Sequence, residues 1–427
     1  MTSHIALWLV VLLTLAGCGS RGQNSQTANN SSANSESNGE GYEHVYYKPR
    51  YAGGFDIVGH ADSTSRIIRI KTLWQGKDST AMELFIRRDG EQVPAGFKGQ
   101  VIDEEARHLC LMSSSYVAML DLLGETERIA ALSGIDYISN TWVQSNHENI
   151  TDIGPDSSAD YERLIASGTD LVLLYGIASS SPMESRLRAL GIPYLYLSEY
   201  LEPSPLGRAE WITAVAEIVA SRPAGAMLFD KIESNYLSLQ SLIPSDIDRP
   251  EVMLNLPYGD IWYMSPAHTG TAQMIEDAGA HYIWAGEANG NNAKPSEANG
   301  KKKTKEPISN KSTPIDFEEA YSLASKADNW LNLGQATSLE QILNKYPVFA
   351  NLDCVKERRL YNNDARTTAS GGNDFWETGQ VRPDIVLCDL IRIFHPELLD
   401  EQVINNLEIV ANLDSLYFKN LYYYRRF

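Results

Sequence analysis

The chain has 427 residues, of which 43% are hydrophobic, so it is long enough to bury more than one compact core. Its formal net charge at pH 7 is −19. A surface with this charge repels nucleic acids and anionic membranes, which disfavours a protein that binds either of them through a basic groove.

The first residues combine a short apolar stretch with a cysteine. The stretch from Ile5 to Leu15 is too short for a permanent transmembrane helix and suits the core of a signal peptide. It leads into Leu15-Ala16-Gly17-Cys18, which resembles a bacterial lipobox, although no Lys or Arg precedes the apolar stretch. The resemblance implies a signal peptide over residues 1–17, cleavage before Cys18 and acylation of its thiol. The alternative is an ordinary signal peptide with a chance cysteine.

Residues 18–41 are rich in Ser, Asn, Gly and Gln. A segment of this composition cannot bury a core, so it predicts a flexible tether between the lipid and the folded protein. Lipid and tether together would hold the protein at a membrane without a spanning helix.

The remaining cysteines are Cys110, Cys354 and Cys388, and none belongs to a C-x-x-C pair. Cys110 lies in a strand-like run and Cys388 in a helical one. We expect both to be buried free thiols, with one disulfide among the three as the alternative.

The folded part begins with alternating apolar and polar runs over residues 42–100, which predict β-hairpins. From residue 107 the pattern changes to strands that alternate with helices, as in strand 108–112, helix 116–123 and strand 170–174. This alternation predicts a parallel sheet. Together these segments form a predicted N-terminal lobe over residues 42–221.

A helical stripe follows over residues 222–244, and its length of about 30 Å is enough to link two lobes. The alternative is an ordinary surface helix, because periodicity does not distinguish the two. After Pro250 the strand-helix alternation restarts, which predicts a C-terminal lobe over residues 245–427. Residues 286–312 interrupt it with Asn, Gly, Lys, Ser and Pro, and this composition predicts a disordered surface insertion.

One pattern occurs in both halves. Asp160-Tyr-Glu162 precedes a strand that opens with Asp170, and Asp316-Phe-Glu318 precedes a strand that opens near Asp328. Two lobes built alike would produce this repetition, and chance similarity of two amphipathic segments is the alternative.

The chain resembles bacterial substrate-binding proteins of ABC importers for iron siderophores, haem and cobalamin. The resemblance rests on the order and spacing of several short stretches between about residues 107 and 397. These are Leu111 to Gly124 with Arg128-Ile129, Asp160 to Leu174, Pro205 to Trp211, Ile261-Trp262 with Asp277 to Gly279, Ala327 to Trp330, and Pro383 to Leu387.

The resemblance implies an α/β fold of two Rossmann-like lobes, each a mainly parallel sheet with helices. One long helix joins the lobes, and the first lobe carries the β-rich extension. It also implies a monomeric, periplasmic protein that holds a ligand between the lobes and delivers it to an ABC permease. Glu162 and Glu318 match the family's surface glutamates, which dock onto permease arginines through paired hydrogen bonds. Alternatively, these two side chains only cap or solvate their helices.

Loops that follow parallel strands form the mouth of such a sheet. Here they are rich in aromatic and amide side chains, which suit a large flat or catecholate ligand. The predicted ligand contacts are Tyr116, Trp142, Tyr175, Tyr258, Trp262, Arg366, Asn373 and Trp376. Arg366 would attract an anionic ferric chelate. Core packing competes with ligand contact for each aromatic ring.

The preferred ligand is a ferric siderophore, with haem or cobalamin as alternatives, and no resident cofactor is expected. A receptor for bare Zn²⁺ or Mn²⁺ is disfavoured because the eight His residues are scattered along the chain. The sequence contains neither a G-x-S-x-G motif nor a P-loop, so an enzyme is also disfavoured.

Overall fold

The computed structural model describes residues 41–74, 82–177, 179–284, 312–410 and 417–427. The predicted signal peptide, Cys18, the tether up to residue 40 and the insertion up to residue 311 lie outside these ranges and stay predictions. The residues from Asn38 to Phe427 form one compact unit. Within the described ranges, no helix has the length and apolar character needed to cross a membrane.

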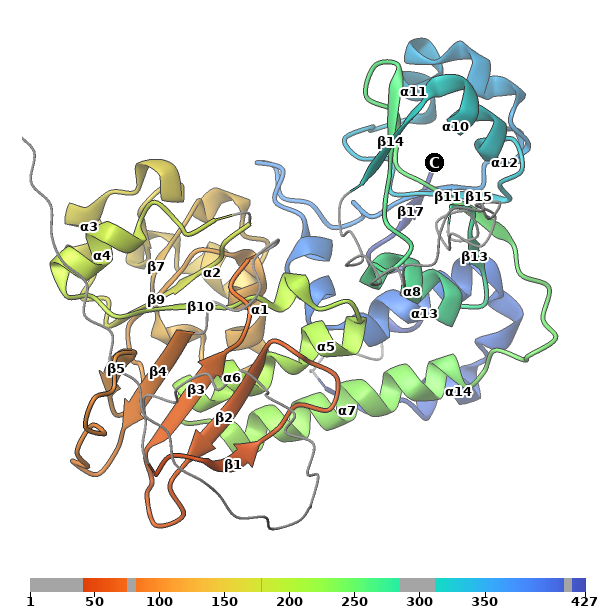
Figure 1. Ribbon diagram of the computed structural model, residues 1–427. Helices are drawn as coiled ribbons and strands as arrows, with labels where there is room; N and C mark the ends of the chain where they lie inside the picture. The colour runs from red at the N-terminus through yellow and green to blue at the C-terminus, as the bar shows by residue number, and fades with distance from the viewer. Residues whose placement is uncertain (1–40, 75–81, 178, 285–311, 411–416) are drawn as a thin grey trace, which may run out of the picture. The chain divides into compact units, whose positions relative to one another are not determined.

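The N-terminal extension is a five-stranded sheet (Figure 1). Its strands are β1 (His44–Tyr47), β2 (Phe55–Gly59), β3 (Arg66–Ile70), β4 (Met82–Arg87) and β5 (Gln100–Asp103). The first four pair antiparallel in chain order, which confirms the predicted hairpins, and β5 pairs parallel with β4. Alternate side chains such as Phe55 and Ile57 are buried in the core of the first lobe, as the period-two pattern of a strand requires.

The first lobe contains a five-stranded parallel sheet in the order β10-β9-β6-β7-β8. Its strands are β6 (Leu109–Leu111), β7 (Ile129–Leu132), β8 (Thr151–Asp152), β9 (Leu171–Leu174) and β10 (Tyr194–Tyr196). The helices of this lobe are α1 (Ser114–Leu123), α2 (Thr141–Ser145), α3 (Tyr161–Ala166), α4 (Glu184–Leu190), α5 (Pro205–Glu210) and α6 (Ile212–Ile218). Buried β6 and β9 carry the continuous apolar runs that a covered parallel sheet needs.

A single helix, α7 (Arg222–Gln240), takes part in both hydrophobic cores. Leu228, Phe229 and Ile232 pack in the core of the first lobe. Tyr236 and Leu239 pack in the core of the second. The helix therefore passes from the core of the first lobe to the core of the second between residues 232 and 236. Figure 1 shows α7 as one uninterrupted helix.

The second lobe has a sheet in the order β13-β11-β15-β16-β17, in which only β17 runs antiparallel to its neighbour. The strands are β11 (Glu251–Leu254), β13 (His281–Tyr282), β15 (Asn329–Leu331), β16 (Leu360–Asn362) and β17 (Arg425–Arg426). A two-stranded antiparallel sheet joins β12 (Ile261–Met264) to β14 (Thr313–Asp316). The helices are α8 (Gly270–Asp277), α10 (Phe317–Ala324), α11 (Leu339–Lys345), α12 (Asp353–Lys356), α13 (Pro383–Phe394) and α14 (Glu401–Asn405).

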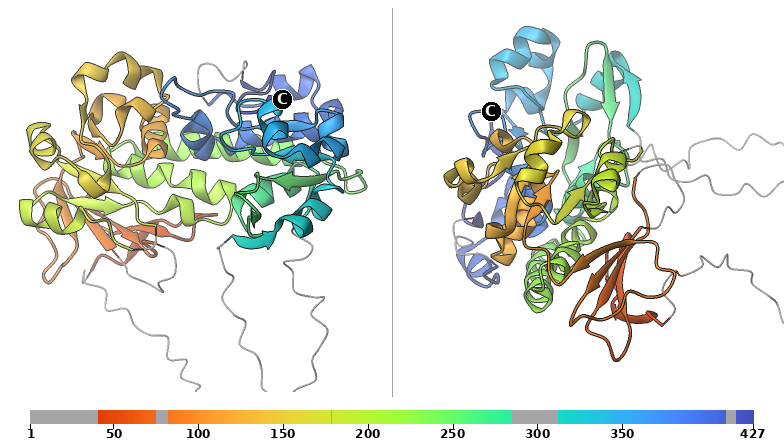
Figure 2. Two further views of the ribbon diagram at one scale, coloured as in Figure 1. Left: turned by 90° about the horizontal axis from the view of Figure 1, so that it is seen from above. Right: turned by 90° about the vertical axis from the view of Figure 1, so that its left-hand side faces the viewer.

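The two lobes repeat the same local structure. In each parallel sheet the first strand lies between the second strand and a later one: β6 lies between β7 and β9, and β11 lies between β13 and β15. Figure 2 shows the strands of the extension, coloured red to orange, as a sheet of their own beside the green helices. Asp160 and Asp316 cap α3 and α10 by accepting a backbone N–H at 3.0 and 2.8 Å. The carboxylates of Asp170 and Asp328 accept a backbone N–H at the start of β6 and of β11. The predicted α/β fold with two mainly parallel sheets is confirmed.

Two buried carboxylates fix the extension to the first lobe. Glu210 accepts the hydroxyl of Tyr47 at 2.7 Å and three consecutive backbone N–H groups of residues 50–52, each at 2.8 Å. Glu202 accepts two more backbone N–H groups, from residues 53 and 54, at 2.9 Å. Charge-assisted hydrogen bonds of this kind are among the stronger ones, so the loop between β1 and β2 is held firmly.

Candidate functional site

The fold defines one edge of each parallel sheet as the place for a ligand. In the first lobe the chain leaves β6 and β9 toward opposite sides, and in the second lobe it leaves β11 and β15 in the same way. Such a point opens a crevice beyond the carboxyl ends of the strands. The loops at these edges include residues 113–116, 137–142 and 175–181 in the first lobe and 257–262 and 366–376 in the second.

Two of the predicted ligand contacts are core residues instead. The Tyr116 ring is fully buried, and its hydroxyl donates to the backbone carbonyl of Leu197 at 2.9 Å. Trp262 is also fully buried, its Nε1 donates to a backbone carbonyl at 3.1 Å, and its ring stacks on Trp330 at 5.4 Å between centroids. Both rings contribute to core packing and present no face to a ligand, which corrects the sequence-based assignment for these two residues.

Other aromatic rings of these loops are accessible. Tyr258 is 80% exposed and Trp376 is 56% exposed. Trp142 and Tyr175 are partly buried against the core of the first lobe, and burial raises the pKa of Tyr175. Tyr137, which was not among the predicted ligand contacts, is 62% exposed in the loop after β7. Its position between β7 and α2, in a loop at the carboxyl edge of the sheet, was the feature that could have identified it as a ligand contact.

The predicted polar contacts lie in one loop, residues 364–382, between β16 and α13. The Nε of Arg366 donates to Asp374 at 2.8 Å, and its guanidinium carbon lies 4.4 Å from the ring centroid of Tyr422. Burial alone would lower the pKa of Arg366, but the hydrogen bond to Asp374 raises it, so the side chain stays cationic. Asn373 bonds to a backbone carbonyl and a backbone N–H within the loop, so it shapes the loop.

The 364–382 loop of the second lobe touches the first lobe directly. The contacts join Ser114 Oγ to the Trp376 carbonyl at 3.4 Å, the Ser139 N–H to Glu377 Oε2 at 2.8 Å, and Arg208 Nη1 to Gln380 Oε1 at 2.5 Å. A cavity between α5, α8 and this loop measures about 20 Å³. It has room for about one water molecule, so this cavity does not hold a large ligand.

Buried carboxylates accompany this contact. Burial and the nearby charge of Asp374 raise the pKa of Glu377 to about 7, although the Ser139 N–H counteracts them. Glu377 Oε1 is buried and has no hydrogen-bond partner among the described residues. Burial likewise raises the pKa of Glu199 to about 7, and its Oε1 accepts the hydroxyl of Ser115 at 2.7 Å.

The comparisons with known proteins agree with this architecture. A family model described as periplasmic binding protein matches residues 110–367, which is more than half of the chain. The chain belongs to the periplasmic binding protein family. Proteins of this family bind a small ligand and deliver it to the permease of an ABC importer, and the family is a transporter component rather than an enzyme class.

Individual relatives of this binding protein are distant. An uncharacterized lipoprotein of Methanocaldococcus jannaschii is 23% identical over 337 residues, which cover 75% of this chain and 74% of the relative. A periplasmic binding protein from Veillonella parvula DSM 2008 is 12% identical, with a TM-score of 0.52 and coverage of 78% and 99%. The periplasmic haem-binding protein RhuT from Roseiflexus sp. RS-1 is 16% identical, with a TM-score of 0.48 and coverage of 69% and 100%. At 12% identity the Veillonella parvula structure shows the fold alone.

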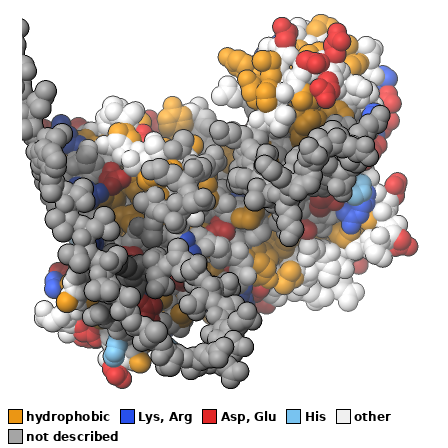
Figure 3. All heavy atoms as spheres, viewed as in Figure 1, with side chains coloured by type: hydrophobic (Ala, Val, Ile, Leu, Met, Phe, Trp, Pro, Cys, Tyr) orange, Lys and Arg blue, Asp and Glu red, His pale blue; other side chains and the backbone are white. Residues whose placement is uncertain are grey.

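The two predicted docking glutamates occupy equivalent places in the binding protein. Glu162 is the second residue of α3, and Glu318 is the second residue of α10. Both side chains are exposed. In the view of Figure 3, hydrophobic side chains and a group of Asp and Glu side chains lie together on the second lobe.

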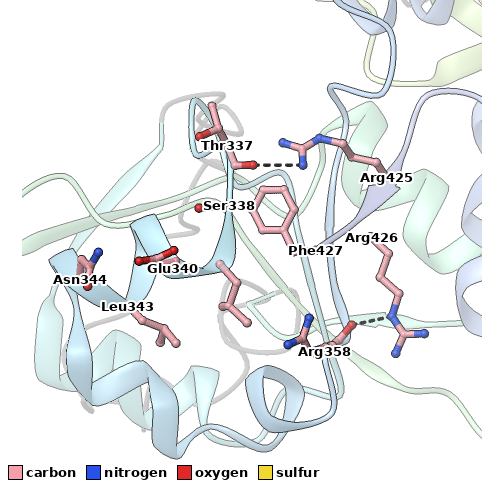
Figure 4. A pocket seen from close by; sticks show the side chains of 10 residues that line it. Thr337, Ser338, Glu340, Leu343, Asn344, Arg358, Arg425, Arg426 and Phe427 are labelled. Atoms are coloured by element: carbon pink, nitrogen blue, oxygen red, sulfur yellow. Dashed lines mark hydrogen bonds between the residues drawn. The ribbon is translucent and has the colours of Figure 1, made fainter.

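The second lobe also contains a cavity of about 720 Å³ that is separate from the contact between the lobes (Figure 4). Its lining comes from α11, the turn before β16 and the last residues of the chain. Arg425 donates to the Thr337 carbonyl at 3.3 Å, and Arg426 donates to the Arg358 carbonyl at 2.7 Å. These hydrogen bonds hold two of the lining arginines to the backbone of the same lobe.

The thiol prediction is confirmed. Cys110, Cys354 and Cys388 are buried and unpaired, and burial raises the pKa of Cys354 to about 11 and that of Cys388 to about 12. Within the described ranges, no three His, Cys, Asp or Glu side chains form a group that could hold a metal ion.

Proposed function

We propose that this binding protein captures a ferric siderophore or a related metal chelate between its lobes and delivers it to an ABC permease. The observation that carries the proposal is the exposure of three aromatic rings, Tyr137, Tyr258 and Trp376, on loops at the carboxyl edges of the sheets. Catecholate or macrocyclic chelates need apolar ring faces and a few fixed polar groups. Haem and cobalamin have the same requirement and are the alternative ligands.

Arg366 supports an anionic chelate as the first choice. Its Nε is engaged by Asp374, whereas Nη1 and Nη2 form no hydrogen bond within the described residues. A guanidinium offers five N–H donors in a planar fork, so the free edge is available for a carboxylate or catecholate oxygen. Because Arg366 and Trp376 belong to the same loop, one segment supplies both the cation and a ring face.

We further propose that the protein is monomeric and anchored in the periplasm by a lipid on Cys18. The lipobox-like sequence before Cys18 and the lipoprotein name of the archaeal relative support the anchor. Docking of Glu162 and Glu318 onto permease arginines completes the proposed delivery step. The matched position of the two glutamates in the repeated lobes supports this pairing.

Purified protein tests the ligand. Tryptophan fluorescence would be titrated with a ferric catecholate siderophore, haem and cobalamin, and the absorption spectrum of protein from its native source would identify a retained chelate. Trp376→Ala should weaken binding up to about tenfold, since an aromatic contact contributes about 0.5–1.5 kcal/mol, whereas Trp376→Phe should retain most of the affinity. Absence of binding to all three chelates would refute the proposal.

A further inference from the structure

A further cavity lies where the N-terminal extension meets the helices of the first lobe. It measures about 190 Å³ and is lined by Arg66, Arg88, Glu217, Ala220, Arg222 and Pro223. Arg66 and Arg88 belong to the extension, which precedes the region matched by the family model. The cavity therefore exists only because the extension packs on this lobe.

The charges around this cavity are unbalanced. Three guanidinium groups line it with a single carboxylate, although the protein as a whole carries a net charge of −19. Arg88 Nη1 donates to Glu217 Oε1 at 2.7 Å, and Arg222 Nε lies 3.5 Å from Glu217 Oε2. Glu217 is almost fully buried, so its one negative charge is shared by two arginines and leaves two positive charges in excess.

The guanidinium of Arg66 accounts for much of the excess positive charge around the cavity. This guanidinium lies 3.5 Å from the ring centroid of Tyr46. Among the residues that the structure describes, only its Nη1 makes hydrogen bonds, to the carbonyls of Ser63 and Ser65. Burial lowers the pKa of Arg66, and the charges of Arg222 and Arg88 lower it further. The three cations thus repel one another in a partly desolvated place, where an anion would relieve the repulsion.

We propose that this cavity binds a phosphate-type oxyanion. Arginine forks match the oxygens of a phosphate group, and charge-assisted hydrogen bonds are among the strongest a protein makes. The volume is below the range of drug-sized ligand pockets, which suits a single anionic group. The 19-residue helix α7 begins at Arg222, so the positive end of its dipole also lies at the cavity.

The anion has two candidate sources, free inorganic phosphate and the phosphorylated headgroup of a membrane lipid. Calorimetry on the full chain, at constant ionic strength, would compare inorganic phosphate with glycerol 3-phosphate as a headgroup analogue. Saturable binding of either anion supports the proposal. Tighter binding of glycerol 3-phosphate indicates a lipid headgroup, and equal or weaker binding indicates free phosphate. Lack of saturable binding of both up to about 10 mM overturns the site.

Variants separate the site from general salt effects, because phosphate also stabilises proteins by exclusion from their surface. Arg222→Gln should weaken anion binding at least about tenfold, and the exposed Arg186→Gln should leave it unchanged. Glu217→Gln should tighten binding, because it removes the only competing carboxylate, while it lowers the melting temperature without anion. A lower melting temperature with no gain in affinity would assign Glu217 and the arginines to structure alone. Chelate affinity should be unchanged in Arg222→Gln, so this test is independent of the proposed transport function.

Discussion

Replacing Glu377 by Gln should stabilise the protein at high pH and not at low pH. Glu377 joins the second lobe to the first through the Ser139 N–H, and it is completely buried. Burial raises its pKa from the ordinary value of 4.5 to about 7. Its contribution to stability is therefore fully present below about pH 4.5, where the carboxyl is neutral in both states. It is lost as the pH rises through 7, where the buried group must ionise.

The size of this loss follows from the change in pKa. Each tenfold difference in proton affinity corresponds to about 1.4 kcal/mol, so a rise from 4.5 to about 7 costs on the order of 3 kcal/mol above pH 8. Glutamine has the shape of the neutral acid and keeps an acceptor oxygen for the Ser139 N–H. We expect Glu377→Gln to match the wild type within about 1 kcal/mol at pH 5 and to exceed it by roughly 3 kcal/mol at pH 8.

Urea denaturation of both proteins at pH 5 and pH 8 measures this difference. Glu199 and Asp389 also have pKa values raised to about 7 by burial, but their effect is common to both proteins and cancels. Glu162→Gln, at an exposed site, serves as the matched control and should change nothing at either pH. If Glu377→Gln is less stable than the wild type at pH 8, the hydrogen bond to Ser139 outweighs the cost of burial and the reasoning is wrong.

Three further changes have defined outcomes. Glu162→Arg and Glu318→Arg should leave chelate affinity unchanged and lower uptake by cells, most in the double variant. The reason is that positive side chains would then face the permease arginines, and unchanged uptake would show that docking uses another surface. Glu210→Gln should lower the free energy of unfolding by about 2–4 kcal/mol in urea titrations, because two of the four donors to this buried side chain lose a carboxylate acceptor. A loss below about 1 kcal/mol would contradict this. Replacing residues 286–312 by a short Gly-Ser link should shift the melting temperature by only a few degrees, since their composition cannot bury a core; a large decrease would show that they pack.

Local patterns predicted much of the fold. The predicted strand 170–174 corresponds to β9, and the predicted helix over residues 222–244 corresponds to α7. Short strands such as β12 and β17 were not predicted, because each is stabilised by a partner strand far away in the sequence. Local propensity cannot report such long-range pairing.

The site was harder to predict for a related reason. Tyr116 and Trp262 come after a strand of a parallel sheet, where ligand contacts are expected. Each belongs to the element that follows that strand, α1 or β12, and is buried in the core. Tyr137 has the same position in its loop and is exposed, so the sequence signal does not separate the two cases. The contact between Ser139 and Glu377 joins residues 238 positions apart, and no periodicity could reveal it.

The shared helix α7 determines whether the chain can be divided into two stable halves. Because α7 gives Leu228 and Phe229 to one core and Tyr236 and Leu239 to the other, neither half of the chain contains a complete interior of its own. A chain cut before α7 removes from the first lobe the helix side chains that complete its core, and a chain cut after α7 removes them from the second lobe. Although the lobes repeat one pattern, either half alone would leave an apolar face of its core uncovered, so we expect the two halves to fold stably only as one chain.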